Sequence, residues 1–196
     1  MENHHSLKNA SLIGLVAALI LTLLSILGLS VYIISPDGQL IVIAIAYALL
    51  TIALYQLGKI YHNKKMMIFA FVAVIVVAAN LLITLINGFL SGSPIVRDFL
   101  YIMSINHLQI AQIIITQALV IGSYGIALYI LGKLSKISLF RYSAFMLMIG
   151  LILNSLDTAV VLSGESTGVI LDFLSFVISV SAWALCLFAF NKLRKG

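Results

Sequence analysis

Five polar side chains interrupt two long apolar stretches of this sequence, and they are the first candidates for chemistry. Asn80 is followed by Thr84, and Asn154 is followed by Asp157 and Thr158. At helical spacing, each group lies on one face of a helix. Amides and hydroxyls exchange hydrogen bonds and Asp157 adds a carboxylate, so a cationic or hydrogen-bond-donating ligand would suit them. The same side chains could instead hold neighbouring helices together, and both interpretations stay open.

His107 is a further candidate, because a histidine can bind a metal ion or a haem iron. Such a site needs a second ligand at the same level of the fold, and His4, His5 and His62 fall in other parts of the chain. The sequence contains no phosphate-binding loop, dinucleotide-binding turn, zinc motif or nucleophile elbow. We therefore expect no cofactor, no metal site and no catalytic residue, and we predict that the protein is not an enzyme.

The composition places these residues in a membrane. The chain has 196 residues, of which 63% are hydrophobic and 9% charged, and its mean hydropathy is +1.20. A water-soluble fold of this size could not bury so much apolar surface. A spanning helix needs about 20 apolar residues, and backbone polar groups in lipid must pair within the segment. The sequence therefore predicts one all-α domain, a polytopic membrane helical bundle over residues 1–196. Its six transmembrane helices are expected at approximately 11–34, 39–57, 66–87, 108–131, 139–162 and 168–190.

An internal repeat relates four of these helices. The stretch IALYQLGK at 52–59 returns as IALYILGK at 126–133, an offset of 74 residues. The same offset pairs Asn80 with Asn154 and Thr84 with Thr158, whereas Asp157 has Ile83 as its counterpart. The repeated unit is then a helical hairpin, 39–57 with 66–87 and 108–131 with 139–162. Two membrane passes restore the starting direction, so the copies are parallel and related by an axis along the membrane normal.

The charges predict the orientation. Lysines and arginines concentrate at both chain ends and in the connections that follow 39–57 and 108–131, where the net charge is +9. The opposite side carries −4, and the two values give the formal net charge of +5. By the bias of lysine and arginine toward the inner face, we expect both termini in the cytoplasm of a multi-pass cell-membrane protein. The basic residues lie beside the membrane in short loops, so we expect the lipid bilayer as a partner and no nucleic acid.

The segment 94–106 leaves two possibilities open. If it continued the helix at 108–131, that helix would exceed the thickness of the membrane and project outward. Otherwise the segment forms a separate interfacial helix. The small residues at Ser104 and Ala111, which lie seven apart, favour a continuous helix.

Three stretches resemble one family. They are LGKLSKISLFRYSAFMLMIGLIL at 131–153, LFAFNK at 187–192 and LGKIYHNKKMMIFAF at 57–71. Together they resemble an archaeal family of small multi-spanning integral membrane proteins that is catalogued as a domain of unknown function. The resemblance implies an archaeal membrane location, and it carries over no activity.

Two functional hypotheses follow. The first is a non-enzymatic small membrane subunit or scaffold, whose partners are other membrane subunits or further copies of this chain. The second is a small transporter, channel or substrate-binding membrane component with a polar site in the outer half of the bundle. A retained small molecule would favour the second hypothesis, and a stoichiometric protein partner would favour the first.

Overall fold

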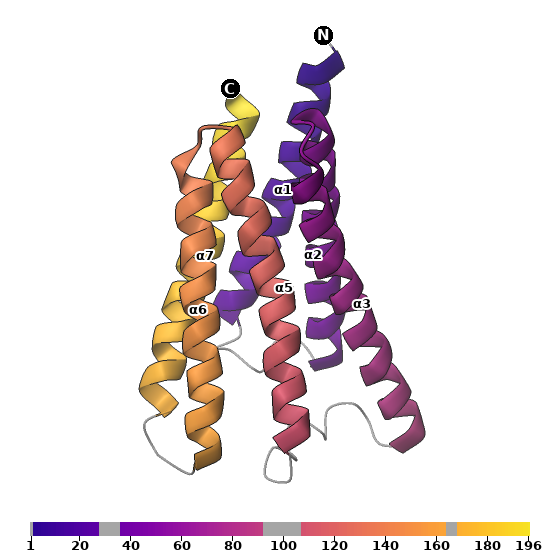
Figure 1. Ribbon diagram of the computed structural model, residues 1–196, viewed down its shortest axis with the longest axis vertical. Coiled ribbons are helices and arrows are strands. Elements are labelled where there is room, and N and C mark those ends of the chain that lie inside the picture. Colours follow the sequence, from indigo (N-terminus) through magenta and orange to yellow (C-terminus); the bar gives the residue numbers. More distant parts are fainter. Residues whose placement is uncertain (1, 28–35, 92–106, 164–167) are drawn as a thin grey trace.

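The structure is a computed structural model that describes residues 2–27, 36–91, 107–163 and 168–196. Within these ranges it describes all side chains except those of 2–3, 27, 36–40, 80–81, 83–91, 107–113, 157–163 and 168–169. The described residues form long α-helices, and short turns at 61–63 and 135–137 join two pairs of them (Figure 1). The helices are α1 (Glu2–Leu27), α2 (Pro36–Ile60), α3 (Lys64–Ser91), α5 (His107–Leu134), α6 (Ser138–Ser163) and α7 (Gly168–Lys195). The all-α prediction agrees with this part of the chain.

Five of these helices are long and apolar enough to cross a membrane. The spans lie at His4–Ile26, Ile41–Ile60, Ile114–Leu134, Ser138–Leu156 and Ile170–Lys195. The chain is therefore a multi-pass membrane protein. The predicted span at 66–87 belongs to α3, and most side chains of its second half lie outside the described residues. That sixth span stays a prediction.

Several helices extend beyond the apolar stretches that predict them. Helix α1 begins at Glu2 rather than near residue 11, and α7 continues to Lys195 rather than 190. The added turns are polar. In α1, for example, the Asn9 side-chain amide donates to the His5 ring, one turn earlier, at 3.0 Å. The length of an apolar stretch predicts only the part of a helix that lies in the hydrocarbon region of the membrane. The helix itself can continue into the headgroup region, where polar residues are also accommodated. Helix α2 begins at Pro36 because proline suits the first helical turn.

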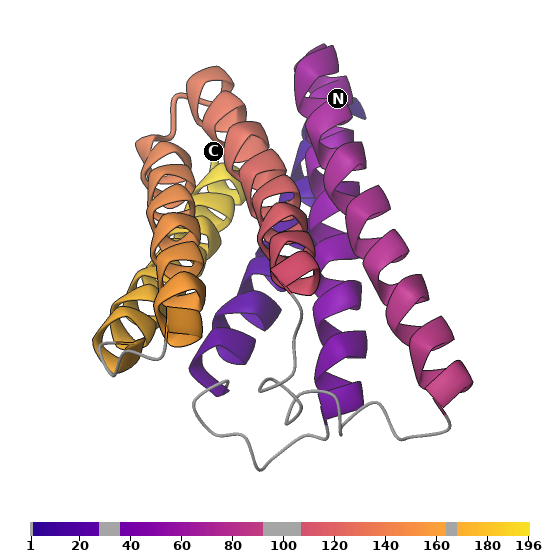
Figure 2. The same cartoon turned by 60° about the horizontal axis from the view of Figure 1, so that its bottom comes forward.

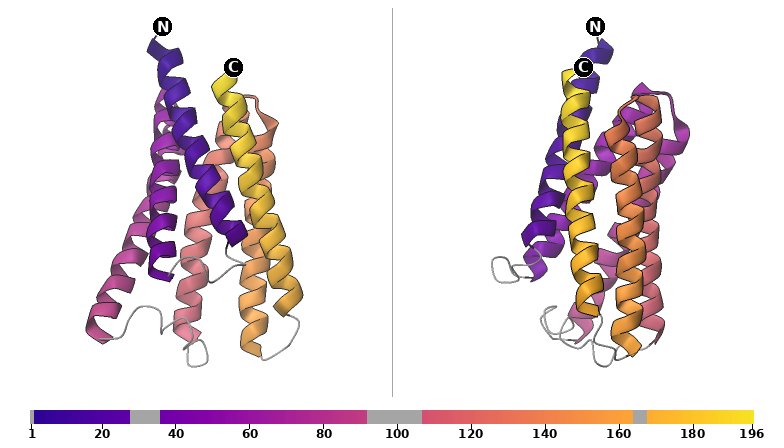
Figure 3. Two further views of the ribbon diagram at one scale, coloured as in Figure 1. Left: turned by 180° about the vertical axis from the view of Figure 1, so that it is seen from behind. Right: turned by 90° about the vertical axis from the view of Figure 1, so that its left-hand side faces the viewer.

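The helices form a closed ring. Each packs against the next along the chain, α7 packs against α1, and α2 also touches α5. Figure 2 shows the helices around a common middle, and Figure 3 shows α3 leaning away from the bundle at the end opposite the termini. Both termini and the turns after α2 and α5 lie at one end, which carries the lysines and arginines of these segments (Figure 1). We call it the basic end.

The two turns at the basic end have matching backbones. His62 and Lys136, which are 74 residues apart, both have positive φ angles, of 51° and 58°. Just before them, the Tyr61 amide donates to the Leu57 carbonyl at 2.9 Å, and the Ser135 amide donates to the Leu131 carbonyl at 2.8 Å.

The basic half of the bundle is filled with large apolar side chains. The rings of Phe140 and Phe190 meet edge to face, with centroids 4.9 Å apart, and both are fully buried. Phe190 also lies directly over Gly14, where any larger side chain would overlap the ring. Leucines from the ends of α2 and α5 complete this core: Leu54, Leu57, Leu128 and Leu131. The bundle is therefore closed at the basic end.

Candidate functional site

The opposite half of the ring contains an open cavity of about 480 Å³. Helices α1, α2, α5, α6 and α7 contribute its walls, and no described residue of α3 lines it. The lining residues are Leu24, Ser25, Tyr47, Ile121, Leu147, Gly150, Leu151, Asn154, Asp172, Phe173, Ser175, Phe176, Ser179 and Trp183. A mostly apolar wall of this size with a few polar groups is typical of a small-molecule site.

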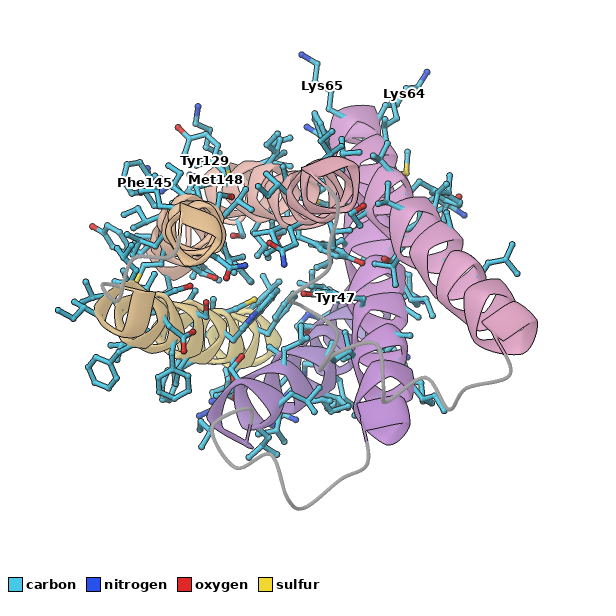
Figure 4. All side chains as sticks on the ribbon, turned by 90° about the horizontal axis from the view of Figure 1, so that it is seen from below. Tyr47, Lys64, Lys65, Tyr129, Phe145 and Met148 are labelled. Carbon is cyan, nitrogen blue, oxygen red and sulfur yellow. The ribbon has the colours of Figure 1, made fainter. Side chains whose placement is uncertain are left out.

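Aromatic side chains from three helices meet at the inner end of the cavity, where Tyr47 and Trp183 line the wall and Tyr124 packs against Tyr47. Tyr47 of α2 stacks on Tyr124 of α5, with ring centroids 5.2 Å apart and planes 9° from parallel. Trp183 of α7 meets Tyr47 edge on, at 6.3 Å and 63°. Figure 4 shows Tyr47 pointing into the middle of the ring of helices. We call Tyr47, Tyr124 and Trp183 the aromatic floor.

Hydrogen bonds fix the floor in place. The Tyr124 hydroxyl donates to the Tyr47 carbonyl at 2.9 Å and lies 2.8 Å from the hydroxyl of Thr51. Thr51 also donates to the Tyr47 carbonyl, at 2.9 Å. The bond from Thr51 lies within α2, and the two hydroxyls share two protons among these three contacts. The contacts of the Tyr124 hydroxyl tie α2 to α5 where the two helices touch, next to the Tyr47 ring.

One face of α7 supplies most of the polar wall. Asp172, Ser175, Ser179 and Trp183 are spaced by three or four residues and therefore lie in one row along the helix. Asp172 is exposed near the start of α7, while Ser175 and Trp183 are buried. The Ser175 hydroxyl donates to the Gly150 carbonyl of α6 at 3.4 Å. Gly150 also leaves room for this row, because a methyl group there would lie 3.3 Å from the Ser179 oxygen.

Asn154 is the predicted candidate that the structure places in the cavity wall. Its side-chain amide donates to the Gln117 carbonyl oxygen of α5 at 2.8 Å, and its residue lines the cavity. The contact joins α5 to α6, as expected for an interhelical hydrogen bond. Asn154 is therefore consistent with both interpretations of the polar residues, a ligand site and a hydrogen bond that holds two helices together.

The other predicted candidates lie on described helices, but their side chains fall outside the described residues. Asn80 and Thr84 belong to α3, Asp157 and Thr158 to α6, and His107 is the first residue of α5. Their joint site with Asn154 stays a prediction. The segment 94–106 also lies outside the described residues. Among the side chains that are described, no three metal-ligating groups come together.

Three polar groups of the cavity have no hydrogen-bond partner among the described residues. They are the hydroxyls of Tyr47 and Ser179 and the indole N–H of Trp183. Trp183 is only 5% exposed. Trp183 is buried, whereas Tyr47 and Ser179 are half-buried, so all three groups are placed to hydrogen-bond with water or with a ligand in the cavity.

Sequence reasoning missed Tyr47, Asp172, Ser179 and Trp183. A signal for them existed, since the row of polar residues on α7 recurs at helical spacing on an otherwise apolar helix. The single tryptophan of the chain also lies far from either end of its helix, although tryptophan in membrane proteins favours the interfaces.

In comparisons with known proteins, no protein-family model, curated protein or solved structure matches the chain.

Proposed function

We propose that this protein is a non-enzymatic, substrate-binding component of the cell membrane that holds a small molecule in the cavity of its helical ring. The observation that carries the proposal is the set of polar groups on Tyr47, Ser179 and Trp183 that have no hydrogen-bond partner among the described residues and lie in a mostly apolar, open cavity of about 480 Å³. A role purely as a subunit or scaffold would not require such a cavity. The part of the cavity wall that the structure describes also includes no histidine, cysteine or lysine that could act with Asp172 in acid–base or nucleophilic chemistry.

The ligand enters from the side opposite the basic end. The filled core around Phe140 and Phe190 separates the cavity from the basic end. The bias of lysine and arginine puts that end, with both termini, in the cytoplasm. The cavity then faces the outside, as in a carrier or binding component in its outward-facing state.

We extend this proposal to the architecture of the bundle, in which the internal repeat makes α2–α3 and α5–α6 equivalent hairpins. Residues 74 apart have equivalent burial on both sides. Buried pairs are Ala53 with Ala127, Leu54 with Leu128, Leu57 with Leu131, Met66 with Phe140 and Ala70 with Ala144. Exposed pairs are Ile52 with Ile126, Ile68 with Tyr142, Phe71 with Phe145 and Ile75 with Ile149. Tyr47 and Ile121 are also 74 apart and both line the cavity, which supports a cavity close to the axis between the hairpins.

Native mass spectrometry of gently solubilised protein tests the binding function. We expect the wild-type protein to retain a small molecule at one copy per chain. Ser179→Leu should abolish retention, because it fills the cavity beside Gly150. The control is Phe145→Leu, which also introduces a leucine, at a side chain that is 69% exposed on the outer face of α6.

A wild-type protein without a retained small molecule would contradict the proposal. So would a Ser179→Leu variant that keeps the molecule. A stoichiometric protein subunit in place of a small molecule would support the scaffold hypothesis instead.

A further inference from the structure

The cavity wall has an unbalanced charge. Among the lining residues that the structure describes, Asp172 is the one charged residue, and none is a lysine, arginine or histidine. The Asp172 side chain is exposed near the start of α7, at the end of the cavity farthest from the apolar core of the basic end. A carboxylate that has no basic neighbour among the described side chains, in a mostly apolar mouth, attracts cations and repels anions.

The inner end of the cavity also suits a cation or an apolar body. Trp183 and Tyr47 present aromatic rings there, and Phe173 and Phe176 line the wall beside Asp172. Aromatic faces attract organic cations and pack against apolar groups. Asp172 and Trp183 are eleven residues apart on one helix face, which corresponds to about 16 Å. The cavity therefore has a charged mouth and an aromatic floor separated by the length of an extended small molecule.

We propose that the ligand is a monovalent organic cation with an elongated aromatic or aliphatic body. Its ammonium group lies at Asp172, and its body extends along Ser175 and Ser179 to the aromatic floor. This inference rests on the proposed binding function and adds the chemical class of the ligand. A zwitterionic lipid headgroup fits less well, because its phosphate would find no basic side chain among the described lining residues.

The fluorescence of Trp183 provides the measurement, because it is the only tryptophan in the chain. The full-length protein is placed in nanodiscs of phosphatidylglycerol, so that no lipid ammonium group competes. Three probes share one phenylalkyl body: 6-phenylhexyl-trimethylammonium, the neutral N,N-dimethyl-7-phenylheptanamide and the anionic 7-phenylheptanoate. We expect the cation to change the Trp183 emission with an affinity about tenfold above that of the amide, and the carboxylate to bind most weakly.

Asp172→Asn should lower the affinity for the cation about tenfold, to the level of the amide. The affinity for the amide should not change, which also shows that the variant is folded. The control is Glu2→Gln, which removes a carboxylate at the basic end and should leave both affinities unchanged.

Equal affinities for the three probes, or an Asp172→Asn variant that binds the cation as the wild type does, would overturn the cation class. If Ser179→Leu then abolishes binding of all probes, the binding function still stands. A Trp183 emission that does not respond to the cation would also overturn the inference.

Discussion

Among single residues, Tyr124 has the best-defined role, because it joins two helices at the aromatic floor. It is fully buried, stacks on Tyr47 and shares hydrogen bonds with the Tyr47 carbonyl and the Thr51 hydroxyl. Tyr124→Phe keeps the stacked ring and removes the hydroxyl. Thr51 still donates to the Tyr47 carbonyl, so one acceptor remains satisfied. We expect a loss of about 0.6 to 1.7 kcal/mol, the range for hydrogen bonds between membrane helices.

Thermal unfolding in detergent measures this loss. Tyr129→Phe is the matched control on the same helix, because Tyr129 is exposed and lies with Phe145 and Met148 on the outer face of α5 and α6 (Figure 4). A decrease in Tm for Tyr124→Phe should have no counterpart in Tyr129→Phe. Equal decreases would show that the buried hydrogen bonds contribute nothing specific.

At the level of single residues, the sequence indicates the polar members of a site better than the aromatic members. An amide within an apolar stretch is conspicuous, and Asn154 does lie between helices against Gln117. An aromatic ring in such a stretch is not conspicuous, because the lipid-facing and core-facing surfaces of a membrane helix are both apolar. Phe140 is 0% exposed and Phe145 is 69% exposed, although the two residues are five positions apart on one helix. Only the neighbouring helices distinguish them.

For the helices, a close packing requirement that involves backbone lies at Gly132, near the end of α5. A methyl group there would lie 3.0 Å from the backbone nitrogen of Arg141 and 3.1 Å from the Phe140 side chain. The backbone cannot move aside cheaply, since α6 begins at Ser138 directly after the turn. Gly132→Ala should therefore lower the stability by about 1 to 3 kcal/mol, the usual cost of overpacking.

Gly122 on the same helix provides the matched comparison, because a methyl group there would meet nothing within 4 Å. Alanine is the better helix former, so Gly122→Ala should leave the stability unchanged or raise it by up to about 1 kcal/mol. The two variants are compared by Tm in one detergent. A Gly132→Ala variant as stable as Gly122→Ala would contradict the close packing of α5 against α6.

The predicted positions of the helices agree with the structure more closely than their ends do. The stretch at 139–162 becomes Ser138–Ser163, and the stretch at 108–131 becomes His107–Leu134. Apolar length identifies such segments because lipid admits few alternatives. The outward polar turns of α1 have no such signal, because polar residues beside a membrane form helices and loops alike.

The sequence could not predict how the whole molecule closes. The contact between α1 and α7 joins the two ends of the chain, and no pattern in either helix marks it. That contact completes the cavity wall, since both helices contribute to it through residues such as Ser25 and Ser179. A site formed by five helices becomes visible only when the ring is assembled, even though each helix is recognisable alone.

The orientation of the whole molecule determines which compartment supplies the ligand, and cysteine labelling of intact cells tests it. The background is Cys186→Ala, because the one native cysteine is buried and its removal leaves no competing thiol. A membrane-impermeant maleimide should label Asp37→Cys and Glu165→Cys, which lie on the side opposite the basic end by the charge distribution. Lys64→Cys, at the exposed start of α3, should remain unlabelled until the cells are permeabilised. Labelling of Lys64→Cys in intact cells, with protection of the other two, would place the basic end outside and direct the cavity toward the cytoplasm.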